Sequence, residues 1–313
     1  MNTEAVKTLK NFGQVKLNEP MVKHTTFKIG GPADVFLILT ETEKVVEALQ
    51  YLDGEGIPYF ILGGGSNMLV RDDGFRGVVV NIHTTQLQIQ GDLVVADAGC
   101  TTVEVARKSI QSGLVGFEWG VGVPGTIGGA VRGNAGAMGM EMKDNVEKVE
   151  IYTNGELHEL GNYDCHFAYR ESIFKTQNGI VLRVHLKLAQ GDAQTAMKKA
   201  LENLQYRNKT QPQGYASTGC IFKNFEITNQ NNALENIPEE FLKKGRISAG
   251  WLIEQVGMKG KQVGKAKVSE VHGNFIVNLG GASASDVLAL VDEIKQRVYD
   301  TFRIEIKEEV QII

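Results

Sequence analysis

Hydrophobic residues recur with a helical period in five stretches of this 313-residue chain. Val45, Val46, Leu49 and Leu52 fall on one face of a helix, for which Thr40 and Glu43 have the spacing of a capping box. The same kind of pattern predicts helices over the segments 101–112, 193–208, 248–257 and 285–302. Thr101 with Glu104 predicts the start of the first of these, and Gly113 predicts its end.

Strands are predicted where apolar residues run continuously or alternate with polar ones between glycine-rich turns. Strands are predicted at the end of the stretch 24–39, within the stretches 58–67 and 76–98, and at 180–188, 274–278 and 303–313. Asn154-Gly155, between two further strand-like runs, is a strong hairpin signal. Helices and strands are mixed without a regular βαβ alternation, which predicts an α+β fold. The pattern changes near residue 192, where a glycine-rich first region gives way to a smaller second one.

Composition narrows the function classes. The net charge of −4 without a long basic run argues against a nucleic-acid binder. No apolar run reaches the roughly 18 residues of a membrane span, and the N-terminus lacks an apolar signal core. Three distant cysteines favour a reducing cytoplasm over a disulfide framework, and the six histidines lack metal-ligand spacing. We therefore expect a cytoplasmic protein without a metal.

The stretch "WGVGVPGTIGGAV", residues 119–131, holds five glycines. Gly120, Gly122 and Gly125 match G-x-G-x-x-G, but the preceding "GLVGFE" is a poor strand and the following segment is too glycine-rich for a convincing helix. These features argue against a Rossmann fingerprint. Glycine still lets backbone N–H groups approach an anion, and a second such segment, "LGGGSN", occupies residues 62–67. Two glycine loops predict one phosphate-bearing ligand, with ligand-free tight turns as the alternative.

Seven motifs extend this interpretation. They are "HTTFKIGGPAD", "ILGGGSNMLV", "GVPGTIGGAV…NAGAMG", "YRESIF", "STGCIFKN", "AGWLIE" and "HGNFIVN", in that order. Together with the terminal "EEVQII" they cover nearly the whole chain, which resembles the UDP-N-acetylenolpyruvoylglucosamine reductase family of bacterial peptidoglycan synthesis.

The resemblance implies a two-lobed FAD-binding region of the vanillyl-alcohol-oxidase (PCMH) type and a smaller α+β substrate-binding domain. On this chain the FAD region would span 1–192, with lobes of roughly 1–83 and 84–192, and the substrate domain 193–302. The last segment, 303–313, would return to the FAD region. The family's extra loop, whose tyrosine covers the substrate, has no room between Arg170 and Lys209, so this chain resembles the short form.

The implied reaction is the NADPH-dependent, FAD-mediated reduction of the enolpyruvyl group of a UDP-sugar to UDP-N-acetylmuramate. This makes the chain a flavoprotein oxidoreductase of cell-wall biogenesis, and so of cell shape, the cell cycle and cell division. The resemblance assigns non-covalent FAD contacts to residues of both glycine loops: Gly63, Gly64, Gly65, Ser66, Asn67, Gly122, Pro124, Gly125, Thr126, Gly128, Gly129 and Ala130.

Three residues are implied in catalysis. Arg170 matches an arginine whose planar fork pairs with the substrate carboxylate. Cys220 stands where family members often carry a serine as the proton donor, and a thiol, with an ordinary pKa of about 8.5, can donate a proton at neutral pH. Glu309 matches a terminal acid that polarises the carboxylate or shares its proton; its neighbour Glu308 should face the opposite side of the strand.

Substrate contacts are implied for Lys209 and Asn224 and, more weakly, for Tyr169 and Asn274. The lysine-rich stretch Lys259–Lys267 is either a solvated surface or a further contact for the diphosphate.

Two other classes of function stay open at this point. One is a thiol hydrolase or acyl transferase that uses Cys220 with His272 and Asn274. The other is a non-catalytic nucleotide-binding module. Neither a nucleic acid, nor a membrane, nor an obligatory protein partner is expected.

Overall fold

The computed structural model describes residues 3–177, 179–227 and 237–313, which group into two compact units. The first comprises Met1–Glu19, Ala33–Gly65 and Phe75–Arg207. The second comprises Pro20–Pro32, Ser66–Gly74 and Asn208–Ile313. Each unit has its own hydrophobic core.

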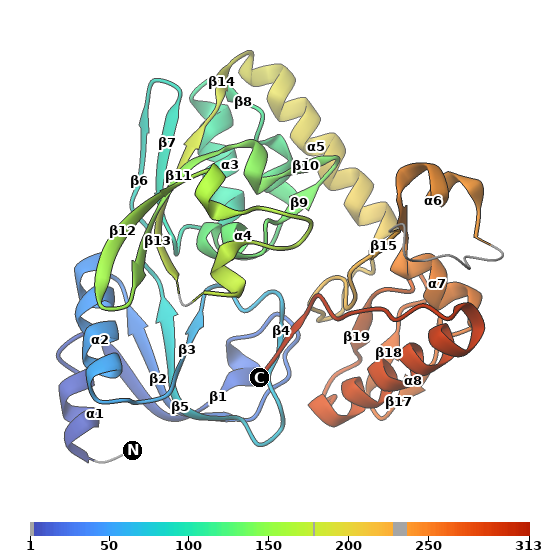
Figure 1. Cartoon of the computed structure of the whole chain (residues 1–313), viewed down its shortest axis with the longest axis horizontal. Coiled ribbons are helices and arrows are strands. Elements are labelled where there is room, and N and C mark those ends of the chain that lie inside the picture. The colour runs from blue at the N-terminus through green and yellow to red at the C-terminus, as the bar shows by residue number, and fades with distance from the viewer. Residues whose placement is uncertain (1–2, 178, 228–236) are drawn as a thin grey trace. The chain divides into compact units, whose positions relative to one another are not determined.

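A four-stranded sheet forms one part of the first unit (Figure 1), in the order β1 (Gln14–Pro20), β2 (Pro32–Leu39), β5 (Phe75–Ile82) and β3 (Tyr59–Leu62). β2, β5 and β3 run parallel, with α2 (Thr42–Gly54) as a connecting helix; α1 is Thr3–Leu9. Helix α2 exists as predicted, but its N-cap is Glu41 and not Thr40, so the predicted capping box is wrong.

A five-stranded antiparallel sheet forms the other part. Its order is β12 (Glu156–Gly161), β11 (Val146–Thr153), β13 (Ile180–Lys187), β7 (Leu93–Asp97) and β6 (Leu87–Gln90). The hairpin predicted from Asn154-Gly155 is confirmed, because both residues adopt positive φ, 51° and 86°, between β11 and β12.

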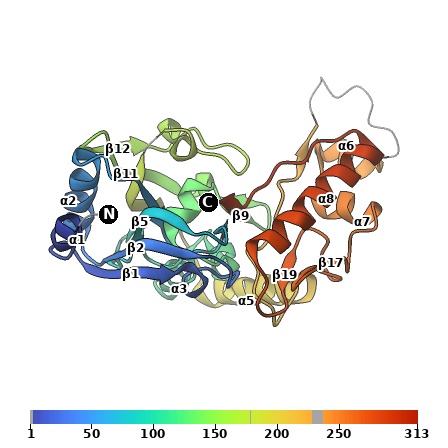
Figure 2. The same cartoon turned by 90° about the horizontal axis from the view of Figure 1, so that it is seen from below.

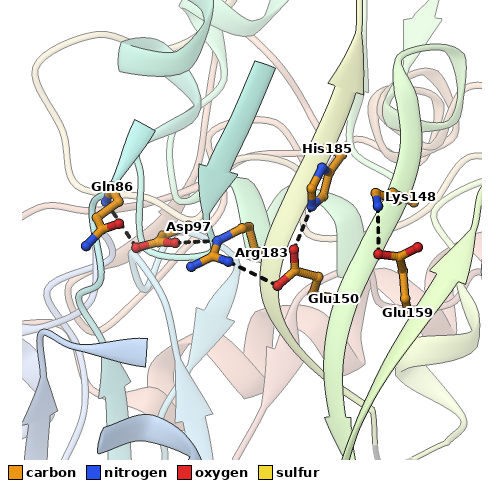
Figure 3. A network of polar contacts seen from close by, with 7 residues as sticks. All are labelled: Gln86, Asp97, Lys148, Glu150, Glu159, Arg183 and His185. Atoms are coloured by element: carbon orange, nitrogen blue, oxygen red, sulfur yellow. Dashed lines mark hydrogen bonds and ion pairs between the residues drawn. The ribbon is translucent and has the colours of Figure 1, made fainter. Parts of the chain in front are cut away.

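Charged side chains cross this second sheet (Figure 3). Arg183 Nε lies 3.0 Å from Asp97 Oδ1, and its Nη1 lies 3.1 Å from Glu150 Oε2. Glu150 also contacts His185 Nε2 at 2.7 Å. These contacts tie β7, β13 and β11 together, and none of these residues belongs to the predicted site.

Helix α3 (Thr102–Gln111) begins and ends as predicted: Thr101 Oγ1 accepts the Glu104 N–H, and Gly113 follows with φ 74°. The glycine stretch differs from expectation, because a short helix, α4 (Ile127–Arg132), begins at Thr126, whose side chain accepts the Gly129 N–H. The segment before it is a 3-10 turn, η2 (Glu118–Gly122), so the strand required by a Rossmann fingerprint is absent there.

Short strands complete the unit: β8 (Leu114–Val115), β9 (Gly136–Ala137), β10 (Met140–Glu141) and β14 (Ala189–Gln190).

The second unit is built around α8 (Ala284–Phe302), which packs on the antiparallel strands β17 (Gln262–Val263), β18 (Ala266–Val268) and β19 (Ile276–Asn278) (Figure 2). It also contains α6 (Glu239–Lys244), α7 (Ala249–Gln255), β15 (Phe225–Glu226) and β16 (Arg246–Ile247). The predicted terminal strand is shorter than expected: only β20 (Gln311–Ile312) forms, and it pairs in parallel with β4 (Met68–Leu69).

Helix α5 (Ala193–Thr210) belongs to the first unit up to Arg207. Its buried residues Ala196 and Ala200 pack against Ile110 of α3, and the first compact unit accordingly extends along α5 to Arg207. The domain limits implied by the resemblance are not tested by this division and stay a prediction. Within the described ranges, no helix has the length and apolar character needed to cross a membrane.

Candidate active site

The two glycine loops of the first unit touch one another. A Cβ on Gly64 would lie 2.9 Å from the Cα of Gly125, and a Cβ on Gly63 would collide with the hydroxyl of Thr126. Real Cβ atoms do not approach other heavy atoms this closely, so a side chain at position 64 requires the backbone of the opposite loop to shift, and one at position 63 requires the Thr126 side chain to move. Glycine at these positions is therefore required for contact between the loops, about 60 residues apart in sequence.

Some backbone N–H groups of these two loops donate hydrogen bonds within the protein, and others do not. The N–H groups of Ile127, Gly128 and Ala130 donate to Cys100, Ala98 and Thr126 carbonyl oxygens at 2.8–3.0 Å. Gly129 donates to the Thr126 hydroxyl. By contrast, the N–H groups of Gly64, Gly125 and Thr126 donate to no protein acceptor within the described part of the chain.

Backbone amides in glycine loops can bind an anion when their donors have no competing partner in the protein. The donor chemistry fits a diphosphate such as that of FAD. The N–H of Gly63 likewise donates to no acceptor in the described part of the chain, whereas those of Gly128, Gly129 and Ala130 donate hydrogen bonds within the fold. Of the remaining predicted contacts, Gly63 and Gly65 follow β3, Gly122 ends η2, and Pro124 precedes Gly125. Ser66 and Asn67 fall in the second unit.

A cation lies beside this loop that the sequence motifs did not indicate. A Cβ on Gly122 would meet Arg207 Cδ at 2.6 Å and Arg207 Nε at 3.1 Å, so the arginine side chain of α5 lies directly on the glycine. The only sequence signal for this contact is the arginine's position near the end of a predicted helix, which does not specify a loop 85 positions away.

Arg170 occupies the tip of a tight turn in the first unit. Ala168 and Glu171 exchange both backbone hydrogen bonds at 3.0 and 3.1 Å, and Arg170 between them has φ 55°. A left-handed conformation is energetically unfavourable for a residue with a Cβ, and such conformations cluster at functional sites. The guanidinium Nη2 donates to the Gly136 carbonyl at 3.1 Å, and its carbon lies 5.2 Å from the centroid of the Tyr169 ring.

Cys220 and Glu309 lie on neighbouring extended segments of the second unit. The Glu309 N–H donates to the Ile221 carbonyl at 2.8 Å, and the Glu309 carbonyl accepts the Asn67 side-chain amide at 3.1 Å. On the other side, Cys220 forms a bridge with Phe275. The structure thus brings three predicted residues, Asn67, Glu309 and Cys220, onto segments that are hydrogen-bonded side by side.

Cys220 differs from the other two cysteines. Cys100 and Cys165 are fully buried, and burial raises the pKa of Cys100 to about 11 and that of Cys165 to about 12. Both therefore stay protonated and out of reach of a ligand. Cys220 is half-buried, so among the three cysteines it is the one a substrate can approach.

The four predicted substrate residues have different surroundings. Lys209 is exposed near the end of α5, and Tyr169 is half-buried beside Arg170. Asn224 Oδ1 accepts the N–H of Ala249 at the start of α7. Asn274 is 3% exposed, and its amide binds both backbone groups of Phe222, at 2.9 and 2.8 Å. Asn274 therefore fixes the segment that carries Cys220, whatever contact it makes with a substrate.

A Cys-His-Asn site is not formed. In such a site an asparagine side chain orients the histidine. Here the Asn274 side chain is bound to Phe222, and His272 Nδ1 instead accepts the backbone N–H of Asn274 at 3.2 Å. Burial, together with the nearby Lys259, lowers the pKa of His272 below its ordinary value. This geometry argues against the thiol hydrolase alternative.

The lysine-rich stretch Lys259–Lys267 is largely neutralised. Lys259 pairs with Glu254 at 3.3 Å, Lys261 with Glu293 at 3.3 Å, and Lys267 with Glu270 at 2.5 Å. These ion pairs favour the solvated surface over the diphosphate contact.

Two parts of the chain match models of known domains. Residues 33–161 match the model of an FAD binding domain, and residues 211–313 match the C-terminal domain of UDP-N-acetylenolpyruvoylglucosamine reductase. The chain is 40% identical over 312 residues to the UDP-N-acetylenolpyruvoylglucosamine reductase of Caldanaerobacter subterraneus subsp. tengcongensis, covering 99% of this chain and 97% of that relative. It is 38% identical to the enzyme of that name from Bacillus subtilis, covering 97% and 95%.

A solved structure agrees with this match. The crystal structure of UDP-N-acetylenolpyruvylglucosamine reductase from Thermus caldophilus superposes with a TM-score of 0.76 at 32% identity, covering 96% of this chain and 98% of that one.

Proposed function

The chain belongs to the UDP-N-acetylenolpyruvoylglucosamine reductase family, and from this premise we propose which of its residues carry out the family reaction. It is an FAD-dependent oxidoreductase that reduces the enolpyruvyl group of a UDP-sugar with NADPH, a step of peptidoglycan synthesis. The predicted α+β fold with an FAD-binding region is confirmed, and its assignment to the vanillyl-alcohol-oxidase type stays part of the proposal. A non-catalytic nucleotide-binding module is excluded by this membership.

The observation that carries the cofactor assignment is the contact between the glycine loops. Gly64, Gly125 and Thr126, which lie where the loops touch, would hold the FAD diphosphate through their N–H groups, since these groups donate to no acceptor in the described part of the chain. FAD, when bound, supplies the hydride chemistry that no side chain of the chain can supply. The protein's own task is to bind the UDP-sugar, stabilise developing charge on its carboxylate and deliver a proton.

Arg170 would perform the electrostatic part of this task. Reduction of an enol ether that bears a carboxylate moves negative charge onto the carboxylate, and a planar guanidinium can pair with both of its oxygens. The turn that holds Arg170 fixes its backbone before substrate arrives, which lowers the cost of reorganisation during the reaction.

Cys220 would deliver the proton to the α-carbon, and Glu309 would polarise the carboxylate or share its proton. The thiol stands where the family often has serine. It can perform the same transfer because a neutral S–H is a competent acid near pH 7. The backbone of Glu309 is held on both sides, by Ile221 and by Asn67, so its position relative to the Cys220 segment is fixed. Tyr169, Lys209, Asn224 and Asn274 complete the proposal as substrate contacts.

The remaining parts of the proposal concern place and partners. We place the reaction in the cytoplasm, because all three cysteines are free and two of them are buried thiols. The enzyme acts on small molecules and needs neither a nucleic acid nor another protein. The domain limits 1–192 and 193–302 belong to the same proposal.

One absorption spectrum and one assay test the assignment. The purified protein should be yellow, with a flavin band that added FAD restores after the cofactor is stripped. NADPH oxidation should then depend on the UDP-enolpyruvyl sugar, with UDP-N-acetylmuramate as the product in mass spectra. A protein that stays colourless after incubation with FAD would contradict the cofactor assignment.

A further inference from the structure

The turn that carries Arg170 is held by a hydrogen bond from a buried side chain outside the predicted site. Asn134 is 0% exposed, and its side-chain amide donates to the Ala168 carbonyl at 2.8 Å. That carbonyl also accepts the Glu171 N–H at 3.1 Å and so closes the turn on whose tip Arg170 lies. Asn134 therefore holds the base of the turn through the same oxygen that closes it.

The other polar atoms of Asn134 hold the opposite loop. Its amide also donates to Glu141 Oε2 at 3.0 Å, and its Oδ1 accepts the Lys143 N–H at 3.0 Å. These residues follow Gly136, whose carbonyl accepts the Arg170 guanidinium at 3.1 Å. One asparagine thus fixes both the backbone of Arg170 and the loop against which its side chain rests.

Backbone conformation shows that this arrangement is held under strain. Asn134, Met138 and Arg170 have φ values of 39°, 54° and 55° and lie in the two loops that Asn134 joins. Asparagine tolerates this region and arginine does so poorly. A left-handed arginine persists only where its surroundings determine the conformation. The Lys175 ammonium adds to this by donating to the Arg170 carbonyl at 2.6 Å.

We propose that Asn134 is a positioning residue of the reductase, which sets the Arg170 guanidinium for the substrate carboxylate. The inference rests on the proposed role of Arg170. Asn134 itself touches neither substrate nor the reacting atoms in this scheme; it acts through the turn Ala168–Glu171.

The test is a double-mutant cycle with Asn134→Gly and Arg170→Ala. Glycine suits the positive φ at position 134, so the substitution removes the amide without adding backbone strain. A displacement of about 1 Å at a reacting group costs about 10²-fold in rate. We therefore expect Asn134→Gly to lower kcat for the UDP-sugar by about 10- to 100-fold per bound FAD. The rate of flavin reduction by NADPH should stay within about twofold of wild type.

The decisive readout is the absence of additivity. If Asn134 acts through Arg170, the double variant should be no slower than Arg170→Ala alone. A purely structural role would instead lower the rate by the same factor in both backgrounds. Asn278→Ala is the matched control, because Asn278 also donates to two backbone carbonyls, of Phe27 and Lys28 at 3.0 and 3.1 Å, and both lie outside the two loops that Asn134 joins. It should lose stability and keep its turnover per bound FAD.

The outcomes separate the two hypotheses. Full turnover in Arg170→Ala would overturn the proposed role of Arg170, and with it this inference. Loss of turnover in Arg170→Ala with an unchanged kcat in Asn134→Gly would overturn the inference alone. If Asn134→Gly does not fold, Lys175→Met tests the same arrangement from the other side. It should lower kcat, and this loss should also vanish in the Arg170→Ala background; an additive loss would contradict the positioning scheme.

Discussion

The cofactor-binding region of the first unit and the Cys220 region of the second are built in opposite ways. In the first, the contact between the loops depends on absent atoms, because Gly63 and Gly64 have no Cβ. In the second, the Cys220 segment is held by hydrogen bonds from the Asn274 side chain and from the backbone N–H of Glu309. Added atoms should therefore damage the first region, and removed atoms the second.

The largest effect should come from Gly64→Ala. Its Cβ would lie 2.9 Å from Gly125 Cα, a backbone atom that cannot move aside alone, so the loops must separate. We expect loss of bound FAD, measured from the ratio of flavin to protein absorbance and by titration of the apoprotein. Gly54→Ala is the control, because a Cβ at that position meets nothing within 4 Å. Equal flavin content in the two variants would show that contact between the loops is not needed.

The second-largest effect is expected from Arg170→Lys. It preserves the charge and removes the planar fork, and the loss of one such stabilising group costs about 10²-fold in kcat. Steady-state kinetics with the UDP-sugar should show this loss, while stopped-flow reduction of the flavin by NADPH should stay normal. Arg76→Lys, at a surface arginine paired with Asp34, is the control. A near wild-type rate in Arg170→Lys would remove Arg170 from the mechanism.

In the second region, the corresponding test removes the thiol of Cys220. Cys220→Ala should still allow NADPH to bleach the flavin, yet should form product at least about 10²-fold more slowly, in line with the contribution of a general acid. Cys220→Ser should keep substantial turnover, since a hydroxyl can deliver the same proton. Rapid product formation by the alanine variant, followed by mass spectrometry, would contradict the proton-donor role.

Asn274→Ala should act through stability. It leaves the buried N–H and C=O of Phe222 without their partner, at a cost of about 1–3 kcal/mol for each group. Asn274→Asp keeps an acceptor for the Phe222 N–H and should lose less. Urea unfolding curves measure both. An unchanged midpoint combined with a higher KM for the UDP-sugar would instead make Asn274 a substrate contact alone.

The smallest effect concerns pH. Because burial lowers the pKa of His272, the unfolded chain binds this proton more readily than the folded one. The contribution of His272 to stability is therefore complete above its ordinary pKa of about 6.5 and declines as the pH falls through that value. The unfolding midpoint of the wild type should decrease between pH 8 and pH 5 by about 2 °C more than that of His272→Gln. If the unfolding midpoints of the wild type and of His272→Gln changed equally with pH, this contribution of His272 to stability would be ruled out.

Much of the fold follows from local sequence. Thr101 and Gly113 bound α3, and Asn154-Gly155 turns β11 into β12, because each of these effects depends on residues a few positions apart. The short helix α4 is not predicted by the sequence, because the four glycines from Gly122 to Gly129 disfavour a helix; the structure shows that Thr126 caps it.

The site could be predicted only in part. Motifs single out Arg170, Cys220 and Glu309, but no local pattern indicates that "AYRES" forms a turn, because its left-handed position holds arginine and not glycine or asparagine. The role of Asn134 depends on a hydrogen bond to Ala168, 34 positions away. The distinction between open and occupied amides in the glycine loops likewise depends on partners such as Ala98 and Cys100.

The pairing of Asn67 with Glu309, 242 positions apart, has a consequence for biosynthesis. The core of the second unit includes Phe27, Ile29 and Leu69 together with residues from 221 to 310. At about 5–20 residues per second a ribosome needs roughly 10–50 s to make the chain between these contacts. During that interval the early apolar residues Phe27, Ile29 and Leu69 have been made, but the residues from 221 to 310 that pack against them have not. The first unit, which ends at Arg207, can therefore fold while the rest of the chain is being made, whereas the core of the second unit closes only once residues up to Val310 have been synthesised.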